Sequence, residues 1–268
     1  MKVFIAGCGW LGSQLAAMLR DHGYQVYGSR RTKQGLSQLP SGIFPLLLDL
    51  SSGEPASDIE PLLHNATIIC AIPPGRQPAT DYLRALQRLL SLAERAGCAG
   101  IIHLSSSGIY QGANGDVDES VSLNTDLPRV AVLKGAEDIL KQSAAPCLMM
   151  RLGGLFGPGR IPGHFVAGKT LPNPHGAVNM VHATDVCRAI LQILATGPFL
   201  SATYNLCSPQ YQNRHSFYQA ACELTKTTVN FSDEPMTSHR VLSDRFMTSY
   251  AFSFRFANAI DGLSFCNL

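Results

Sequence analysis

The sequence predicts an α/β fold in which a doubly wound parallel sheet is followed by a smaller lobe. A glycine-rich turn directly follows the first apolar run, and strand-like apolar runs then alternate with helical segments as far as residue 152. Such alternation favours right-handed crossovers between parallel strands. At 268 residues, 46% of them hydrophobic and 15% charged, the chain can bury a large core.

The first strand, turn and helix carry the most specific pattern. The apolar run 3–6 precedes three glycines spaced G-x-G-x-x-G, and a helix is expected over 13–21. The first glycine permits a tight turn, the second lets backbone N–H groups approach a pyrophosphate, and the third lets helix and strand pack closely. The helix N-terminus favours an anion. The alternative is a tight turn without a ligand. The residues predicted to bind a dinucleotide here are Gly7, Gly9, Trp10, Leu11 and Gly12.

The second expected strand, 25–28, leads into a basic segment, Ser29, Arg30 and Arg31. No acidic side chain follows this strand before Asp49, although an acid here would hydrogen-bond the ribose of NAD. A hydroxyl and two guanidiniums suit a 2′-phosphate instead. The segment therefore predicts NADP as cofactor, with NAD as the second choice. A solvated basic loop is the alternative.

The next elements continue the alternation. A third apolar run, 43–50, contains Asp49, which we interpret as a partner for the adenine. A weak helix is expected at 55–64, a fully apolar fourth strand at 67–72, an amphipathic helix at 80–96 and a fifth strand at 101–104. The residues at the end of the fourth strand that we expect to contact the cofactor are Ala71, Ile72 and Pro73.

The second half of the chain is less regular. A polar loop is expected at 112–126, a helix at 128–143 and a sixth strand at 146–152. The glycine- and proline-rich segment 153–175 is too long for a simple connector, which predicts a functional loop. Further strands are expected at 178–181 and 204–206, with helices at 183–195 and 216–224. We place the dinucleotide-binding domain at 1–175, extended by part of 176–206, and a C-terminal lobe mainly at 176–268.

Four motifs occur in one order along the chain: GCGWLG, SSSGIY, RLGGLFGPGR and NMVHATDV. Together they resemble the extended short-chain dehydrogenase/reductases, the NAD-dependent epimerase/dehydratase family that works on nucleotide sugars. The resemblance covers nearly the whole chain. It implies a Rossmann-type doubly wound parallel sheet with a small C-terminal α+β substrate lobe.

The resemblance also implies roles for individual residues. Ser106, four residues before Tyr110, would hydrogen-bond the reacting oxygen, and it follows the fifth strand at the ligand-binding end of such a sheet. Strand-end hydroxyls that bond the backbone are the alternative. The residues that would border the nicotinamide are Arg151, Gly153 and Gly154. The residues expected to contact substrate include Ser107, Arg160 and His182, and for His182 the alternative is a packed or capping histidine. His164 and Lys169 lie in the irregular segment and could contact an anionic substrate, with a solvated loop as the alternative.

The family's proton donor is a Tyr four residues before a Lys, yet the expected helix at 128–143 contains no Tyr. If Lys134 occupies the Lys position, Val130 replaces the Tyr. If Glu137 instead matches a Glu that often follows the motif, the pair becomes Arg129 and Leu133. Either way the phenol is absent, so the chain looks like an atypical member lacking the catalytic Tyr.

Two other side chains could supply a proton. Lys134 could do so after desolvation, but Asp138 at i+4 indicates an ordinary surface ion pair. Tyr110 could face the reacting groups, but a supporting role in the structure is the alternative.

Composition excludes several classes of function. A net charge of +2 gives no case for nucleic acid or a membrane surface, and no apolar run is long enough for a membrane helix. The first residues do not form a signal peptide pattern, so we expect a cytoplasmic protein. The eight cysteines are scattered without a C-x-x-C pair, which predicts reduced, mostly buried thiols with no metal site.

These observations favour an NAD(P)-dependent oxidoreductase, epimerase or dehydratase acting on a small polar, nucleotide-sugar-like substrate. The competing class is a non-catalytic NADP-binding redox sensor or partner-binding module. A homodimer is also expected, because the helix at 80–96 carries apolar residues around much of its circumference.

Overall fold

The computed structural model describes residues 1–51, 53, 57–75 and 78–267. Its centre is a seven-stranded sheet in the order β11-β7-β5-β4-β1-β2-β3. The pairs β1/β2, β1/β4, β2/β3 and β4/β5 are parallel, which confirms the predicted fold class. The strands are β1 (Lys2–Ala6), β2 (Gln25–Arg30), β3 (Phe44–Leu47), β4 (Thr67–Cys70), β5 (Gly100–Ser106), β7 (Cys147–Leu152) and β11 (Ala202–Leu206).

The strand order reverses between β1 and β4. From β1 the chain proceeds outward through β2 to β3 and then returns to place β4 on the other side of β1. In open α/β sheets, ligands bind beyond the carboxyl ends of the strands at such a switch point. The fold therefore directs attention to the residues that follow β1 and β4.

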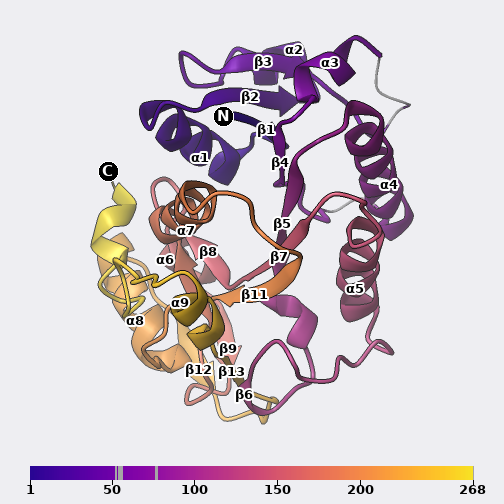
Figure 1. The fold of residues 1–268 in the computed structure, drawn as a ribbon. Helices are drawn as coiled ribbons and strands as arrows, with labels where there is room; N and C mark the ends of the chain where they lie inside the picture. Colours follow the sequence, from indigo (N-terminus) through magenta and orange to yellow (C-terminus); the bar gives the residue numbers. More distant parts are fainter. Residues whose placement is uncertain (52, 54–56, 76–77, 268) are drawn as a thin grey trace. The chain divides into compact units, whose positions relative to one another are not determined.

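Helices cover both faces of the sheet. In Figure 1, α1 lies on one side of β1 and β4, whereas α4 and α5 lie on the other. The helices of eight or more residues are α1 (Trp10–Asp21), α4 (Ala79–Ala96), α5 (Pro128–Leu140), α7 (Ala183–Ala195) and α8 (Arg214–Thr225). The shorter ones are α2 (Lys33–Leu36), η1 (Ser57–Ile59), α3 (Glu60–Leu63), η2 (Ser107–Tyr110), α6 (Pro162–Val166), α9 (Asp244–Ser249) and η3 (Leu263–Asn267). The weak helix expected at 55–64 occurs as η1 and α3, and its first two residues lie outside the described ones.

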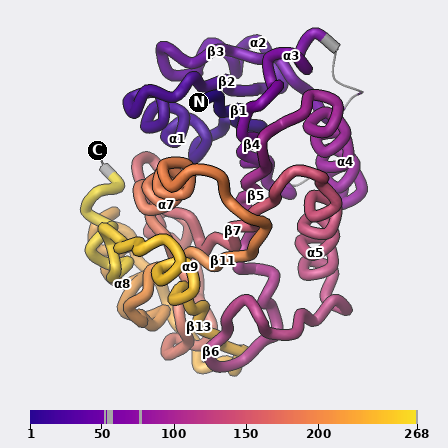
Figure 2. The backbone as a smooth tube through the Cα atoms, viewed as in Figure 1, coloured from indigo at the N-terminus to yellow at the C-terminus, as the bar shows by residue number. Residues whose placement is uncertain are grey.

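Three two-stranded parallel sheets accompany the main sheet. They pair β8 (Gly154–Phe156) with β10 (Met180–His182), β9 (Thr170–Pro172) with β12 (Asn230–Ser232), and β6 (Gly115–Val117) with β13 (His239–Val241). Figure 2 shows β6 and β13 running side by side. The interpretation of 112–126 and 153–175 as irregular was therefore wrong in part. These strands are three residues long and pair with distant segments, so they leave no local pattern.

The chain divides into two compact units. Unit 1 comprises 1–105, 131–150 and 193–203, and unit 2 comprises 106–130, 151–192 and 204–268. In unit 1, the apolar residues of α4 are buried in the main core within one chain, among them Tyr82, Leu86, Leu89 and Leu92. Unit 2 has its own cluster around Phe156 and Phe217. The domain limits expected from the sequence and the homodimer stay predictions.

The cysteines follow the expected pattern of burial. Seven of the eight are buried, and Cys98 is partly exposed. Burial raises the pKa of the Cys70, Cys187 and Cys207 thiols to about 12, so these groups stay protonated at neutral pH. Among the described residues, no helix combines the length and apolarity needed to cross a membrane.

Candidate functional site

The glycine turn follows β1 directly at the switch point. Gly7 has φ +85°, a conformation that side chains disfavour, and Gly9 donates its backbone N–H to the Gly7 carbonyl at 2.7 Å. A Cβ on Gly12 would lie 2.9 Å from the Gly7 carbonyl oxygen, so α1 could not pack here with a larger residue. A Cβ on Gly9 would meet only that same oxygen at 3.8 Å. Space is therefore open beside Gly9 and closed at Gly12.

The N-terminus of α1 begins at this turn. Gly9 is the N-cap, and within the described residues no side chain caps the helix and no acidic residue occupies its first turn. Leu11 and Gly12 turn their side-chain positions into the core. The N-terminal N–H groups and the helix dipole consequently favour an anion next to Gly9.

The end of β4 contacts the same turn. Ala71 donates its N–H to the Ala6 carbonyl at 2.8 Å. A Cβ on Gly7 would lie 3.1 Å from Ile72 Cγ1 and 3.2 Å from the Ala71 carbonyl. The structure thus brings together two segments predicted to bind the cofactor, and exposed Pro73 follows them.

Ser29 bears on one part of the cofactor prediction. Its side chain is buried at 3% exposure, and its Oγ accepts the Gly7 N–H at 3.0 Å while donating to the Ile5 carbonyl at 3.3 Å. These two hydrogen bonds favour a structural role for the hydroxyl, and its contact with a ribose 2′-phosphate stays a prediction. Because β2 continues through Ser29 to Arg30, the hydroxyl points under the turn and holds it in place.

The two arginines that follow differ in environment. Arg30 donates from Nη2 to Ser13 Oγ at 3.4 Å, while its Nε is buried without a hydrogen-bond partner among the described residues. Arg31 is exposed. Asp49 Oδ1 accepts from the Ser51 N–H at 2.9 Å and from the Ser51 hydroxyl at 2.5 Å, so it orders the chain after β3. An unsatisfied buried donor on Arg30 fits a phosphate ligand at this strand end.

Ser105 and Ser106 end β5 and Ser107 follows it, and the three serines have different environments. Ser105 is buried and donates to Glu137 Oε1 at 2.8 Å. Ser107 is also buried. Ser106 is partly exposed, and its Oγ accepts the Gly108 N–H at 3.1 Å, which caps η2. Of the three, Ser106 has the hydroxyl best placed to meet a ligand.

Tyr110 is held inside unit 2. Its hydroxyl donates to Asn205 Oδ1 at 2.8 Å and accepts from Arg151 Nη1 at 2.8 Å, and the ring is 1% exposed. The Arg151 guanidinium carbon also lies 5.2 Å from the ring centroid. Burial raises the pKa of Tyr110, against the opposing effect of the Arg151 charge. This geometry favours the supporting role for Tyr110.

Helix α5 shows how the residues at the expected tyrosine position are used. Lys134 Nζ contacts both carboxylate oxygens of Asp138 at 2.5 Å, so the ion pair indicated by the spacing is present. Val130 is fully buried and Leu133 nearly so, whereas Arg129 is exposed. A tyrosine at position 130 would have to fit into the core.

The glycines after β7 are constrained by packing. A Cβ on Gly153 would lie 2.8 Å from Cys207 Sγ and 3.0 Å from the Asn179 carbonyl oxygen. Gly154 donates its N–H to the same carbonyl at 2.7 Å. These contacts explain the two glycines without a ligand, and their place beside a nicotinamide stays a prediction.

His182 bears on another prediction. Its Nδ1 accepts the Thr184 N–H at 3.1 Å at the start of α7, and its ring packs against Phe156 and Phe256 at centroid distances of 5.1 and 4.6 Å. The side chain is 1% exposed, and burial lowers its pKa to about 4. Enclosure among aromatic rings favours the alternative of a packed or capping histidine, and the substrate contact stays a prediction.

The remaining predicted substrate residues lie on the surface of unit 2. Arg160 Nε donates to the Leu155 carbonyl at 3.0 Å, and its guanidinium carbon lies 5.3 Å from the Phe165 ring centroid. His164, on α6, and Lys169, just before β9, are exposed. The choice between substrate contact and a solvated loop stays open for both.

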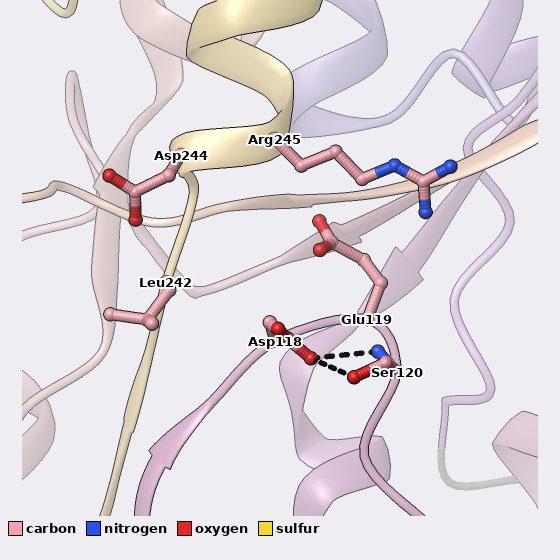
Figure 3. Close-up of a pocket in the computed structure, with 6 residues that line it drawn as sticks. All are labelled: Asp118, Glu119, Ser120, Leu242, Asp244 and Arg245. Carbon is pink, nitrogen blue, oxygen red and sulfur yellow. Dashed lines mark hydrogen bonds between the residues drawn. The ribbon is translucent and has the colours of Figure 1, made fainter.

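Sequence reasoning missed a cavity of about 200 Å³ in unit 2, lined by Asp118, Glu119, Ser120, Leu242, Asp244 and Arg245 (Figure 3). Asp118 Oδ1 accepts from the Ser120 N–H at 2.9 Å, and Glu119 Oε1 accepts the Asn205 N–H at 2.5 Å. The three acidic residues within 116–119 were the available sequence signal for this cavity, but the same composition is typical of an ordinary surface loop. No group of three or more metal-binding side chains occurs among the described residues.

Comparisons with known proteins define the class first. MoeE5 in complex with UDP-glucose and NAD superposes with a TM-score of 0.80 at 22% identity, over 99% of this chain and 97% of that one. The UDP-glucuronic acid 4-epimerase of Bacillus cereus, in complex with UDP-glucuronic acid and NAD, gives 0.80 at 18% identity over the same shares. The chain therefore shares its fold with these two proteins.

Sequence similarity then identifies the family. Protein YeeZ of Escherichia coli strain K12 is 37% identical over 232 residues, which cover 83% of each chain. The chain belongs to the YeeZ family. No family model matches the sequence.

Proposed function

We propose that the protein is an NAD(P)-dependent oxidoreductase, epimerase or dehydratase acting on a small polar, nucleotide-sugar-like substrate. The observation that carries this proposal is the glycine turn at the switch point, with open space beside Gly9 and an N-terminus of α1 that no described side chain caps. The names of the structural neighbours, which record NAD with UDP-glucose or UDP-glucuronic acid, support the same reading.

The residues present fit a dinucleotide. Backbone N–H groups at the start of α1 would hold its pyrophosphate. Ala71 and Ile72, which contact Gly7, would line the neighbouring side of the same site. Arg30 and Arg31 would bind a 2′-phosphate, which favours NADP over NAD. When bound, the nicotinamide supplies the hydride donor or acceptor.

Ser106 is the proposed ligand of the reacting oxygen, because its hydroxyl is partly exposed and its rotamer is fixed by Gly108. No tyrosine occurs in Pro128–Leu140, so the mechanism proceeds without the phenol of the resembled family. The hydroxyl of Tyr110 and the ammonium of Lys134 are already held by other groups.

A non-catalytic NADP-binding sensor is the second candidate. Two observations favour this candidate. Helix α5 contains no tyrosine, and the hydroxyl of Tyr110 is buried in a hydrogen bond to Asn205, so neither position offers a phenol that could transfer a proton. Such a protein would bind cofactor and respond to it through a partner. A cytoplasmic location and a homodimer remain part of either proposal.

The test measures cofactor binding and turnover separately. NADPH and NADH are titrated by nicotinamide fluorescence into the wild type and into Gly9→Val, whose side chain would fill the space beside the turn. Gly9→Val should abolish binding while leaving the circular-dichroism spectrum unchanged. Binding that persists in a folded Gly9→Val protein would show that the cofactor lies elsewhere.

Turnover is then followed with NADP⁺ or NADPH against UDP-glucose, UDP-glucuronic acid and a panel of small carbonyl compounds. Ser106→Ala should lower kcat/KM by a factor that corresponds to about 2–4 kcal/mol of lost transition-state stabilisation, while cofactor affinity stays unchanged. Ser122→Ala, at an exposed serine of the same unit, is the matched control. Turnover that Ser106→Ala leaves intact would refute the serine's role. Cofactor binding without any turnover would favour the sensor.

A further inference from the structure

The guanidinium of Arg129 lies directly against Gly108, the residue that bonds to Ser106. A Cβ built on Gly108 would be 2.7 Å from both Nε and Nη2 of Arg129 and 3.0 Å from its Cζ. Gly108 is not among the residues with positive φ, so its backbone conformation does not require glycine. The guanidinium occupies the space that a side chain at this position would fill.

No contribution to the fold explains this placement. Arg129 is exposed, and among the described residues it has no hydrogen bond or ion pair. It is the second residue of α5, where the positive end of the helix dipole disfavours a cation. An unpaired cation held at that position is more readily explained by a ligand than by stability.

Ser106 and Arg129 meet at the same glycine. The Gly108 N–H donates to Ser106 Oγ at 3.1 Å, while the guanidinium covers the Gly108 Cα. All three residues belong to unit 2. A hydroxyl and a guanidinium thus adjoin one short turn, and both are accessible from solvent.

The same geometry favours one of the two alignments that the sequence left open for α5. Arg129, the occupant of the tyrosine position in one alignment, adjoins the serine turn, whereas Val130, the occupant in the other, is fully buried. In the alignment with Arg129, the position that carries a phenol in the resembled family holds a group that stays charged and supplies no proton at neutral pH.

We propose that Arg129, together with Ser106, binds a carboxylate or phosphate group of the ligand, so that the site selects acidic substrates. A guanidinium matches either anion through two parallel N–H donors. Arg129 is a specificity-determining residue that orients the ligand, and it transfers no proton. The identity of the anion as part of a substrate rests on the proposed function, whereas the anion site itself does not.

The anion site is tested by NMR on protein labelled with ¹⁵N-arginine, at pH 6 and constant ionic strength. Inorganic phosphate and malonate are titrated separately, and the Arg129 Nε–H signal is assigned by its loss in Arg129→Lys. The exposed Arg84, which pairs with Asp81 at 3.3 Å, provides the internal control. The Arg129 signal should shift saturably with at least one anion, while the Arg84 signal responds no more than a surface arginine does.

Gly108→Ala is the decisive variant, because its methyl group would displace the flexible end of Arg129 without removing the charge or straining the backbone. It should weaken the binding of the responding anion by about 10- to 100-fold, which is the effect of losing a charge-assisted contact. Equal responses of Arg129 and Arg84, or unchanged binding in a folded Gly108→Ala protein, would overturn the proposal. Saturation by malonate alone assigns a carboxylate, and saturation by phosphate alone assigns a phosphate.

This experiment tests the anion site separately from the proposed function, because it uses neither cofactor nor turnover. A protein that binds NADPH but whose Arg129 ignores both anions would retain the function and lose the anion site. A protein that shows the anion response but no dinucleotide binding would do the reverse.

Discussion

Ser29 Oγ accepts the backbone N–H of Gly7 at 3.0 Å, so the second strand holds the glycine turn from beneath. Ser29→Ala would leave that buried N–H without its partner. We expect the free energy of unfolding to fall by about 1–3 kcal/mol, the usual cost of an unsatisfied buried donor. Urea denaturation measures this loss.

The same variant tests the role of Ser29 in cofactor binding. Because the hydroxyl lies under the turn, Ser29→Ala should weaken the binding of NADPH and NADH by similar factors. A selective loss of NADPH affinity with unchanged stability would instead support a direct contact with a 2′-phosphate. Ser37→Ala, in an exposed turn after α2, serves as control.

Cofactor preference depends on Arg30 and Arg31. If one of them contacts the 2′-phosphate, NADPH should bind about 10- to 100-fold more tightly than NADH. Arg31→Gln or Arg30→Gln should reduce that ratio of affinities without changing NADH affinity, whereas the control Arg84→Gln should leave the ratio unchanged. Fluorescence titrations decide it, and equal affinities in the wild type would contradict the NADP assignment.

The sequence predicted the sheet well because its signals are local. The glycine spacing, the fully apolar fourth strand and the periodicity of α4 each lie within a short window. The paired strands β6/β13 and β9/β12 escaped notice because three-residue strands are defined by distant partners. For the same reason the positions of the glycines in the turn after β1 were predictable, and the burial of Ser29 was not.

The candidate site was predictable only in part. Ser106 stands out by its place after a strand, but the reason for Gly108 lies in Arg129, 21 positions later in the chain. His182 lies three positions before Asp185 in the sequence, and only packing against Phe156 and Phe256 distinguishes a cap from a ligand. Tertiary contacts of this kind have no counterpart in spacing or composition.

Tyr110→Phe tests the supporting role of that tyrosine. Loss of the hydroxyl would remove the donor to Asn205 Oδ1 and the acceptor for Arg151 Nη1 in the interior of unit 2. We expect a loss of about 2–4 kcal/mol in the free energy of unfolding. Where turnover is found, the pH at which kcat changes should be unaffected. A large fall in kcat with unchanged stability would instead make Tyr110 a catalytic residue.

Acid should destabilise the protein through two buried histidines. In β5, His103 is completely buried, and neither ring nitrogen makes a hydrogen bond of ordinary geometry with the described residues. Burial lowers its pKa from 6.5 to about 4, against an opposing effect of Glu137. The pKa of His182 is lowered to about 4 for the same reason. Protonation of His182 at Nδ1 would also remove the acceptor that caps α7.

The sign of the effect follows from proton linkage. Between pH 6.5 and 4 the unfolded chain binds protons at these histidines and the folded chain does not, so the free energy of unfolding falls as pH falls through this window. Complete titration of His103 would cost about 3 kcal/mol. His103→Leu should flatten the curve of unfolding free energy against pH, whereas exposed His175→Gln should leave its slope unchanged. A curve that keeps its wild-type slope between pH 6.5 and 4 in His103→Leu would show that this ring is not neutral in the folded protein.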